Sequence, residues 1–344
     1  MLNVKLGVTK NPRFEPLING TVKSAKLNLD IVVTTPPELF YRNLKNDEFD
    51  VFEMSLSEYL ITREQAKGER WQWSALPIFP AKAFVWLGLF INTGAGIHNL
   101  ADLRGKRVGV PDYVMTAALW FRAFLRELYN IQPKEISWFI GRTKDLSHGG
   151  ELGMDSKSPP GVSLRWLTTA ETFDVMLDKG EIDAAYGFAP RHDKRLQSID
   201  NIDRYGGTPL EGNPRLGKLF SDGGRETVEA FFQKTGVVPA NHVIVAQRRL
   251  LEQHDWLAGE LFKIFSESKL AAYEKDNFGS PSYLYFESND RAQQTSAFGT
   301  DPFPFGVKQN RKMLEMLFTN SHEEGLTQKL ATIEEVFFPA LLDS

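Results

Sequence analysis

The sequence predicts an α/β protein made of two Rossmann-like lobes, with a central cleft and two crossover strands. Its 344 residues suffice for two lobes of about 150 residues each. Short strand patterns alternate with helical patterns, which is typical of βαβ units. Two apolar runs, at residues 83–91 and 237–246, lie where the chain would cross between lobes and return. Lobe one is expected at residues 1–91 and 245–344, and lobe two at residues 92–244.

Lobe one begins with strand and helix in alternation. Pro36 and Pro37 open a helix, and Ser55 or Ser57 is placed to cap the helix that follows the third strand. The later helix at 255–272 carries an apolar stripe at i, i+4, i+7 and i+8 that packs on a core. The expected strands are 5–8, 29–33, 50–54 and the crossovers 83–91 and 237–246, and the expected helices are 38–45, one from Ser55, 255–272, 310–318 and 332–342.

Lobe two begins with the segment Asn99–Trp120, in which a short charged helix ends at Gly105, a strand covers 107–110, Pro111 breaks it and a helix starts near Tyr113. Backbone N–H groups at a helix start are unpaired, and the helix dipole is positive there. This strand–turn–helix therefore predicts a site for a small acidic ligand. The remaining elements of lobe two are expected as strands 136–140, 163–167 and 182–186 and helices 113–129, 169–179 and 226–234.

The composition excludes several classes of function. A net charge of -4 gives no overall attraction to nucleic acid or to an anionic membrane. The absence of cysteine excludes disulfides and thiolate chemistry. The run at 83–91 is about half the length of a membrane span. No leader pattern precedes the first strand, so the expected location is cytoplasmic, or periplasmic if a leader has been removed.

No cofactor is indicated by the motifs. The glycines at 94 and 96 lack the remainder of a dinucleotide fingerprint, and no Walker lysine pattern occurs. The six histidines show no H-x-x-x-H spacing, although residues from separate loops leave a divalent metal open. The expected partner is a small carboxylate or aromatic acid, and a homo-oligomer is left open.

Five segments together resemble one family of enzymes. They are Glu53–Leu60, Leu103–Pro111 with Met115–Ala118, Gly180–Asp183, Phe305–Lys312 and His322–Leu326. In these segments the chain resembles the 4,5-dihydroxyphthalate decarboxylases, which are similar to type 2 periplasmic binding proteins. The resemblance implies that fold and a non-oxidative decarboxylation of a hydroxylated aromatic dicarboxylate.

Such a reaction needs an anion clamp and a proton donor for the ring carbon. His242, on the returning crossover, is the candidate for proton transfer, and a structural histidine is the alternative. Glu53 serves as a base only if it points into the cleft; otherwise it is a strand-end carboxylate. The candidate substrate-binding residues are Arg13, Ser55, Ser57, Lys82, Tyr113, Thr116, Arg191 and His192. The alternative is a helix cap for the two serines and a solvated surface position for Arg13, Lys82, Arg191 and His192.

A second function fits the same residues. A solute-binding protein for a small carboxylate or aromatic acid would use the same cleft without chemistry. A synthase-like relative in cofactor biosynthesis is a third reading, which the lack of cysteine disfavours. The sequence alone leans toward the decarboxylase because of the resemblance and of His242.

Overall fold

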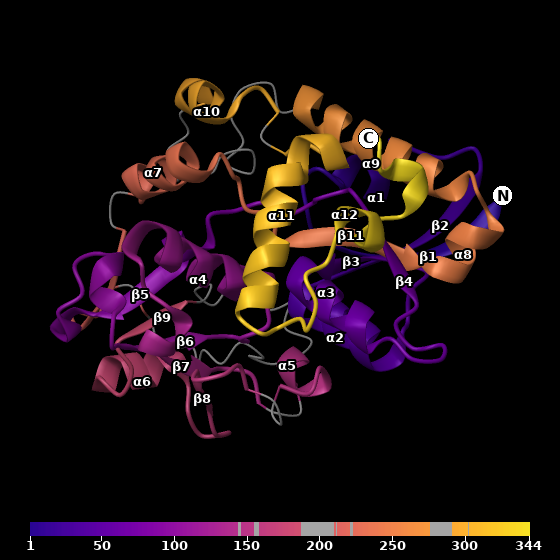
Figure 1. Cartoon of the computed structure of the whole chain (residues 1–344). Coiled ribbons are helices and arrows are strands. Elements are labelled where there is room, and N and C mark those ends of the chain that lie inside the picture. The colour runs from indigo at the N-terminus through magenta and orange to yellow at the C-terminus, as the bar shows by residue number, and fades with distance from the viewer. Residues whose placement is uncertain are drawn as a thin grey trace. The chain divides into compact units, whose positions relative to one another are not determined.

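The computed structural model describes residues 1–143, 146–154, 158–186, 210, 212–220, 223–275, 291–301 and 303–344. The chain forms two compact units (Figure 1). Unit 1 contains residues 1–83, 237–319 and 327–344, and unit 2 contains residues 84–236 and 320–326. The chain passes into unit 2 after residue 83 and returns at residue 237, each earlier than the lobe boundary that the sequence predicts, and it crosses again on each side of residues 320–326.

Unit 1 is built on a sheet with the strand order β2-β1-β3-β11-β4 in the described residues. Its strands are β1 (Leu2–Thr9), β2 (Leu27–Thr34), β3 (Val51–Ser55), β4 (Trp73–Leu76) and β11 (His242–Gln247). Strand β1 is parallel to β2 and β3, whereas β11 is antiparallel to β3 and β4. The carboxyl ends of β1 and β3 and the amino end of β11 consequently share one edge of the sheet.

Unit 1 also contains helices, several of which pack apolar side chains on this sheet. The helices are α1 (Glu15–Ile18), α2 (Pro36–Asn46), α3 (Leu56–Gln65), α8 (Arg248–Gln253), α9 (Leu257–Lys275), α10 (Arg291–Phe298), α11 (Val307–Glu323), whose last residues belong to unit 2, and α12 (Ile333–Val336). The predicted stripe of α9 is confirmed, because Leu261 and Phe265 are buried in one cluster with Leu6 and Ile244 of the sheet. This packing holds β1 and β11 against α9.

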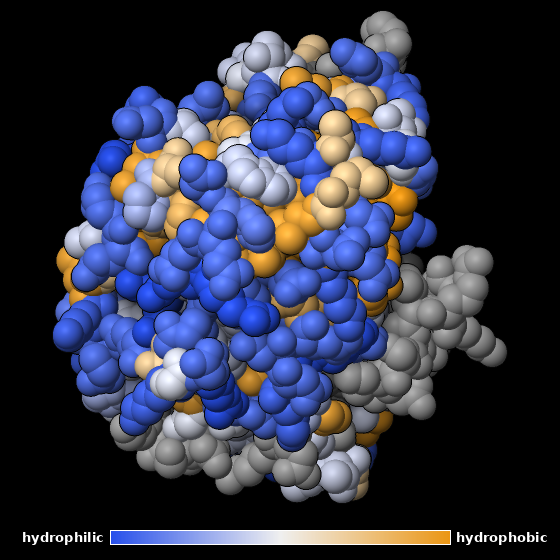
Figure 2. Space-filling view, turned by 90° about the vertical axis from the view of Figure 1, so that its right-hand side faces the viewer, coloured by the Kyte–Doolittle hydropathy of each residue, from blue (hydrophilic) through white to orange (hydrophobic). Residues whose placement is uncertain are grey.

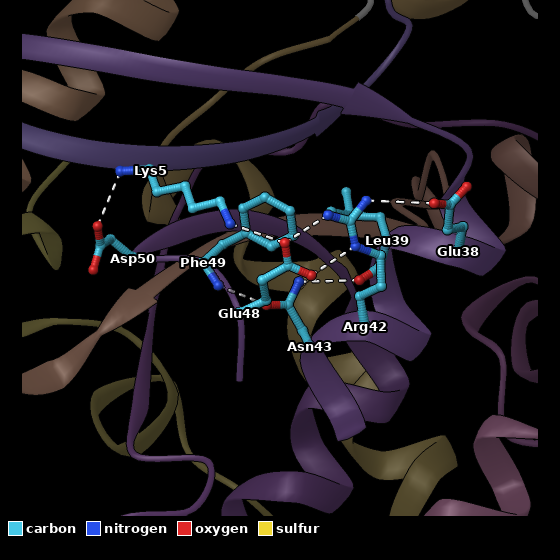
Figure 3. Close-up of polar contacts among 8 residues, drawn as sticks. All are labelled: Lys5, Glu38, Leu39, Arg42, Asn43, Glu48, Phe49 and Asp50. Carbon is cyan, nitrogen blue, oxygen red and sulfur yellow. Dashed lines mark hydrogen bonds and ion pairs between the residues drawn. The ribbon is translucent and has the colours of Figure 1, made fainter. Parts of the chain in front are cut away.

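A charged network joins α2 to the loop before β3 (Figure 3). Both carboxylate oxygens of Glu48 accept hydrogen bonds from Arg42, at 2.6 and 2.7 Å, and Lys5 Nζ donates to Glu48 at 2.9 Å. The hydrogen bond from Arg42 lowers the pKa of Glu48 to about 2, against a smaller opposing effect of burial. The Lys5 backbone N–H also donates to Asp50, so the network fixes where β3 begins.

Unit 2 has a second sheet, with the order β10-β5-β9-β6-β7-β8 in the described residues. Strands β6, β7, β8 and β9 are mutually parallel, whereas β5 and β10 pair antiparallel. The strands are β5 (Leu89–Asn92), β6 (Arg107–Val110), β7 (Ser137–Ile140), β8 (Ser163–Trp166), β9 (Ala184–Tyr186) and β10 (Leu216–Lys218). The helices are α4 (Thr116–Tyr129), α5 (His148–Glu151), α6 (Phe173–Lys179) and α7 (Arg225–Thr235), with short 3-10 turns at Val85–Gly88, Thr93–Ala95, Leu100–Leu103 and Pro133–Glu135.

Several expected elements are wrong in detail. The crossover strand expected at 237–246 is shorter and is β11 at His242–Gln247. The strand expected at 83–91 is a 3-10 turn followed by β5, because Trp86 turns inward and stacks on Phe124 with ring centroids 3.9 Å apart. The helix expected from Tyr113 begins at Thr116. The helix expected at 332–342 ends at Val336, since Phe337 is extended and Pro339 starts a separate 3-10 turn.

One short segment of the chain belongs to unit 2 although its neighbours on both sides belong to unit 1. It is residues 320–326, which include the end of α11. Within unit 2, Arg122 Nε of α4 donates to Glu324 at 2.6 Å, and both side chains are almost fully buried. A buried ion pair thus ties this segment to α4.

The surface of unit 1 over β1, β2 and α8 is mostly hydrophilic, with smaller hydrophobic areas among the polar residues (Figure 2). Large hydrophobic residues that are exposed in this part of the chain include Met1 and Val33. Scattered residues of this kind are ordinary on a folded surface. Among the helices of the described ranges, none combines the length and the apolar character that a membrane crossing needs.

Candidate functional site

The candidate site lies at the edge of the unit 1 sheet where β1 and β3 end and β11 begins. In sheets of this kind, ligands bind beyond the carboxyl ends of the parallel strands. His242, the first residue of β11, is directly opposite Ser55, the last residue of β3. The predicted proton-transfer residue therefore stands at the edge that is suited to ligand binding.

His242 and Glu53 form a hydrogen-bonded pair at this edge. Nδ1 of His242 lies 2.6 Å from Glu53 Oε1. The other carboxylate oxygen, Oε2, accepts the backbone N–H of Thr9 at 2.9 Å and its hydroxyl at 2.8 Å. Because Glu53 is completely buried, both of its oxygens are oriented by protein groups.

The environment of Glu53 favours its ionised form. Burial acts to raise the pKa of Glu53, but the hydrogen bonds from His242 and Thr9 outweigh burial and lower that pKa below its ordinary value. An ionised carboxylate can only accept hydrogen bonds. Nδ1 of His242 therefore carries the proton in this pair, and the carboxylate fixes the tautomer and orientation of the ring.

The second ring nitrogen of His242, Nε2, can interact with a ligand. No hydrogen bond within the described ranges occupies Nε2 of His242, and the side chain is 18% exposed. The rings of His242 and Phe40 meet edge to face, with centroids 4.9 Å apart and planes at 88°. Held by Glu53 and Phe40, the imidazole can present Nε2 to a ligand and exchange a proton there.

Arg13 lies in the loop between β1 and α1 and is buried. Its Nη2 donates to the carbonyl of Pro80 at 2.7 Å, and Asn11 Nδ2 donates to the same carbonyl at 2.8 Å. The guanidinium carbon lies 3.6 Å from the centroid of the Phe303 ring. Arg13 thus brings a buried positive charge to this end of unit 1, in contact with an aromatic face.

Lys82 is buried near the same edge. It forms an isolated antiparallel bridge with Ala240, two residues before His242. Its Nζ donates to Oδ1 of Asn310, the fourth residue of α11, at 2.5 Å. Burial lowers the pKa of Lys82 to about 7, and the charge of Lys269 adds to this effect while Asp301 opposes it.

The two predicted serines are both at the start of α3. Ser55 occupies the N-cap position, as the sequence predicts, but its side chain makes no capping hydrogen bond. Ser57 is in the first turn of α3 and is fully buried. Both hydroxyls are thus at the strand–helix junction beside His242, where their ligand role stays a prediction.

The remaining predicted residues belong to unit 2. Thr116 is the buried first residue of α4. Tyr113 packs in the core, with its ring 5.9 Å from that of Trp138 and the guanidinium carbon of Arg122 3.8 Å from its centroid. Burial raises the pKa of the Tyr113 hydroxyl. Arg191 and His192 lie outside the described residues.

A depression of about 450 Å³ occurs elsewhere in unit 2, at the amino end of β6. Arg107 pairs with Asp183 at 2.7 Å, and Arg215 pairs with Asp178 at 2.6 Å. Four of its charged side chains therefore form two ion pairs, and Lys179 also lines it. In the described ranges, no group of three or more His, Asp or Glu is arranged to hold a metal ion.

Asn310 and Lys269 are the residues of this site that sequence reasoning missed. Asn310 follows Gly306 by four positions at the start of α11, and no spacing rule links it to Lys82. Lys269 stands on the buried stripe side of α9, which is an unusual position for a lysine. A lysine on the buried side of an amphipathic helix is a sequence signal for a buried polar site.

Comparison with known proteins agrees with the resemblance seen in the sequence. The chain is 30% identical over 345 residues to a 4,5-dihydroxyphthalate decarboxylase of Comamonas testosteroni, covering 100% of this chain and 98% of the relative. It is 32% identical over 186 residues to a 4,5-dihydroxyphthalate decarboxylase of Pseudomonas putida, covering 54% of this chain and 70% of the relative. No family model matches the chain.

Solved structures show the same fold at low sequence identity. The periplasmic aliphatic sulphonate binding protein SsuA of Escherichia coli matches with a TM-score of 0.54 and 13% identity, over 100% of both chains. The ligand binding component of an ABC-type import system of Staphylococcus aureus matches with a TM-score of 0.50 and 14% identity, over 100% of this chain and 98% of that one. The fold is that of the periplasmic binding proteins, and the chain belongs to the 4,5-dihydroxyphthalate decarboxylase family.

Proposed function

We propose that this protein removes a carboxylate from a hydroxylated aromatic dicarboxylate such as 4,5-dihydroxyphthalate, without oxidation. The proposal is supported by relatives that bear this activity in their names. The structural observation that carries it is the pair in which Glu53 Oε1 holds His242 Nδ1 at 2.6 Å. A binding protein needs no such oriented and partly exposed imidazole.

The reaction exchanges one carbon–carbon bond for one carbon–hydrogen bond. When the bond to the carboxylate breaks, CO₂ leaves and the electron pair stays on the ring carbon. A ring hydroxyl assists by donating electron density, and a proton must reach the same carbon. His242 delivers this proton from Nε2 and recovers one from solvent, so one proton is consumed for each CO₂ released.

Glu53 orients His242 for proton transfer without touching the substrate. Its Oε1 holds Nδ1 of the ring, which fixes the ring in one orientation. The hydrogen bonds from Thr9 hold the other carboxylate oxygen in place. Glu53 is therefore a positioning residue, and Arg13 and Lys82 supply positive charge for the carboxylates of the substrate.

The test is CO₂ release from a panel of hydroxylated phthalates by the purified protein, with phthalate as the compound that lacks a hydroxyl. We expect turnover on the hydroxylated compounds and a loss of about 100-fold or more in kcat for His242→Asn. The matched control is His254→Asn, which makes the same change at the end of α8 in unit 1, away from the site. It should leave kcat close to that of the unchanged protein.

Two results would contradict the proposal in different ways. Saturable binding of the panel without CO₂ release would identify a binding protein that uses this fold. Turnover of His242→Asn near the original rate would remove His242 from the mechanism while leaving the decarboxylase activity in place.

A further inference from the structure

Lys82 is a buried lysine whose hydrogen-bond partner in the described structure is a neutral amide. The residue is 7% exposed, and its Nζ contacts Asn310 Oδ1 at 2.5 Å. No ion pair between Lys82 and a carboxylate occurs within the described ranges. A buried ammonium without a counter-ion is costly, so a lysine retained here needs an explanation.

Asn310 is itself locked in one orientation. Its Nδ2 donates to the carbonyl of Pro304 at 3.0 Å and to that of Gly306 at 2.7 Å. The amide oxygen must therefore face Lys82, where it accepts a hydrogen bond from either an ammonium or a neutral amine. The position of Nζ is thus fixed in both charge states, and its remaining hydrogen-bonding capacity is left for a ligand.

Two further buried cations lie near Lys82. Lys269 Nζ donates to Asp301 at 2.6 Å and to the carbonyl of Phe303 at 3.0 Å, so Asp301 is already engaged. The Arg13 guanidinium packs against the Phe303 ring. The side chains of Arg13, Lys82 and Lys269 are all buried.

The register of the chain directs Lys82 toward the proton-transfer pair. Lys82 is opposite Ala240, and Ala240 and His242 are two residues apart along the chain. Opposed residues project from the same face of a sheet, as do residues two apart in an extended segment. An acid bound at Lys82 is therefore on the side of the sheet from which His242 projects.

We infer that Lys82, held by Asn310, binds a carboxylate of the acid substrate and takes up a proton as the acid binds. This inference rests on the proposed function, because it assumes an acid ligand at this edge. The free protein has a lysine that titrates near pH 7, with Lys269 and Asp301 as the charged groups acting on it. A carboxylate beside Nζ favours the ammonium, so above pH 7 the complex gains a proton that the free protein lacks.

The experiment uses phthalate, whose two carboxylates match the proposed substrate but which has no hydroxyl to assist CO₂ loss. Calorimetric binding is measured from about pH 6 to about pH 9 in buffers of different ionisation enthalpy, which reports protons taken up. We expect uptake to rise from near zero at the acid end toward about one proton, and affinity to fall about tenfold per pH unit above pH 7.

Three variants separate charge, proton uptake and position. Lys82→Arg keeps a permanent charge, so phthalate should bind with no proton uptake. Lys82→Met should lose about 10- to 100-fold in affinity for phthalate. The control is Lys308→Met, which removes an exposed lysine from the start of α11, the helix that carries Asn310, and this variant should bind phthalate normally. Asn310→Asp gives Lys82 an internal counter-ion, so proton uptake should disappear and affinity should fall.

The outcomes distinguish this inference from the proposed function. Full proton uptake in Lys82→Arg, or affinity independent of pH in the unchanged protein, would overturn the inference even if CO₂ release is observed. Failure of folded, unchanged protein to bind phthalate overturns it as well. Proton-coupled phthalate binding without CO₂ release from any hydroxylated phthalate would retain the Lys82 site and refute the decarboxylase.

Discussion

Glu53 is fully buried and is hydrogen-bonded to His242, the proposed proton donor. A carboxylate with no solvent contact would ordinarily favour its neutral form, yet three hydrogen bonds from His242 and Thr9 keep it ionised. The charge is therefore maintained by a small number of donors, and each can be removed separately. The role of Glu53 can be measured apart from that of His242.

Glu53→Gln should lower kcat by about 10- to 100-fold and leave KM within about threefold. The amide cannot accept at both of its ends, so the ring of His242 loses either its orientation or its support. The loss is expected in kcat and not in KM, because Glu53 orients the ring of His242 without touching the substrate. A purely structural role would not produce this split between kcat and KM.

The control for this variant is Glu64→Gln near the end of α3, where the carboxylate accepts from the backbone of Gln328 and Lys329, at the opposite end of the helix from Ser55. An unchanged kcat for Glu53→Gln would leave Glu53 as a structural carboxylate.

At the scale of elements, both sheets contain a glycine where a side chain from a helix lies against the strand. A Cβ at Gly7 in β1 would lie 2.7 Å from Leu39 of α2, and one at Gly109 in β6 would lie 2.5 Å from the Phe173 ring of α6. Neither glycine has a positive φ, so close packing explains the residue type in both. These contacts bring helix and strand together at the core of each unit.

Gly109→Ala should therefore destabilise the protein by about 1–3 kcal/mol, measured by urea unfolding. Phe173 is fully buried and the added methyl cannot be accommodated without moving its ring. Gly217→Ala in β10 of the same sheet is the matched control, because its Cβ would meet Thr93 at an ordinary 3.7 Å. Equal stability of the two variants would show that Phe173 can move at no cost.

For the whole molecule, the pair of Arg122 and Glu324 shows that unit 2 depends on residues far along the chain. Burial raises the pKa of Glu324, although Arg122 and Arg126 oppose this effect. Both side chains are almost fully buried, so removing the carboxyl group leaves the guanidinium of Arg122 buried without its partner.

Glu324→Gln should lower the free energy of unfolding by about 2 kcal/mol, followed by thermal or urea denaturation. Glu323→Gln is the control, since the neighbouring side chain is 57% exposed and its contact with Arg126 is 3.7 Å. A surface pair of this kind contributes about 0–1 kcal/mol. A result in which Glu323→Gln is the more damaging change would contradict the importance of the buried pair.

Much of the fold could be predicted from the sequence, because local patterns determine most of its elements. The alternation of strands and helices predicted strands at 107–110 and 182–186 and the apolar stripe of α9, and the structure has them at Arg107–Val110, Ala184–Tyr186 and Leu257–Lys275. The turn at Val85–Gly88 could not be predicted, since Trp86 packs on Phe124 and Phe231, which follow much later in the chain.

The candidate site was predictable only in part, for a similar reason. His242, Arg13 and Lys82 were proposed because they stand at expected strand ends or crossings, and their roles toward a ligand stay predictions. The orientation of Glu53 depends on which face of β3 it occupies and on Thr9 from another strand, which no single segment reveals. Asn310 meets Lys82 across 228 positions of sequence, and such long-range pairs are set by tertiary packing.

The central place of β11 in the first sheet constrains the order in which the protein can form during synthesis. Strand β11 lies between β3 and β4, yet the ribosome reaches it only after all six described strands of unit 2. Until then β3 and β4 have no partner between them and expose backbone groups and apolar side chains. The first sheet is therefore completed only after β11 has been made, and the nascent chain must keep its first 83 residues from aggregating until then.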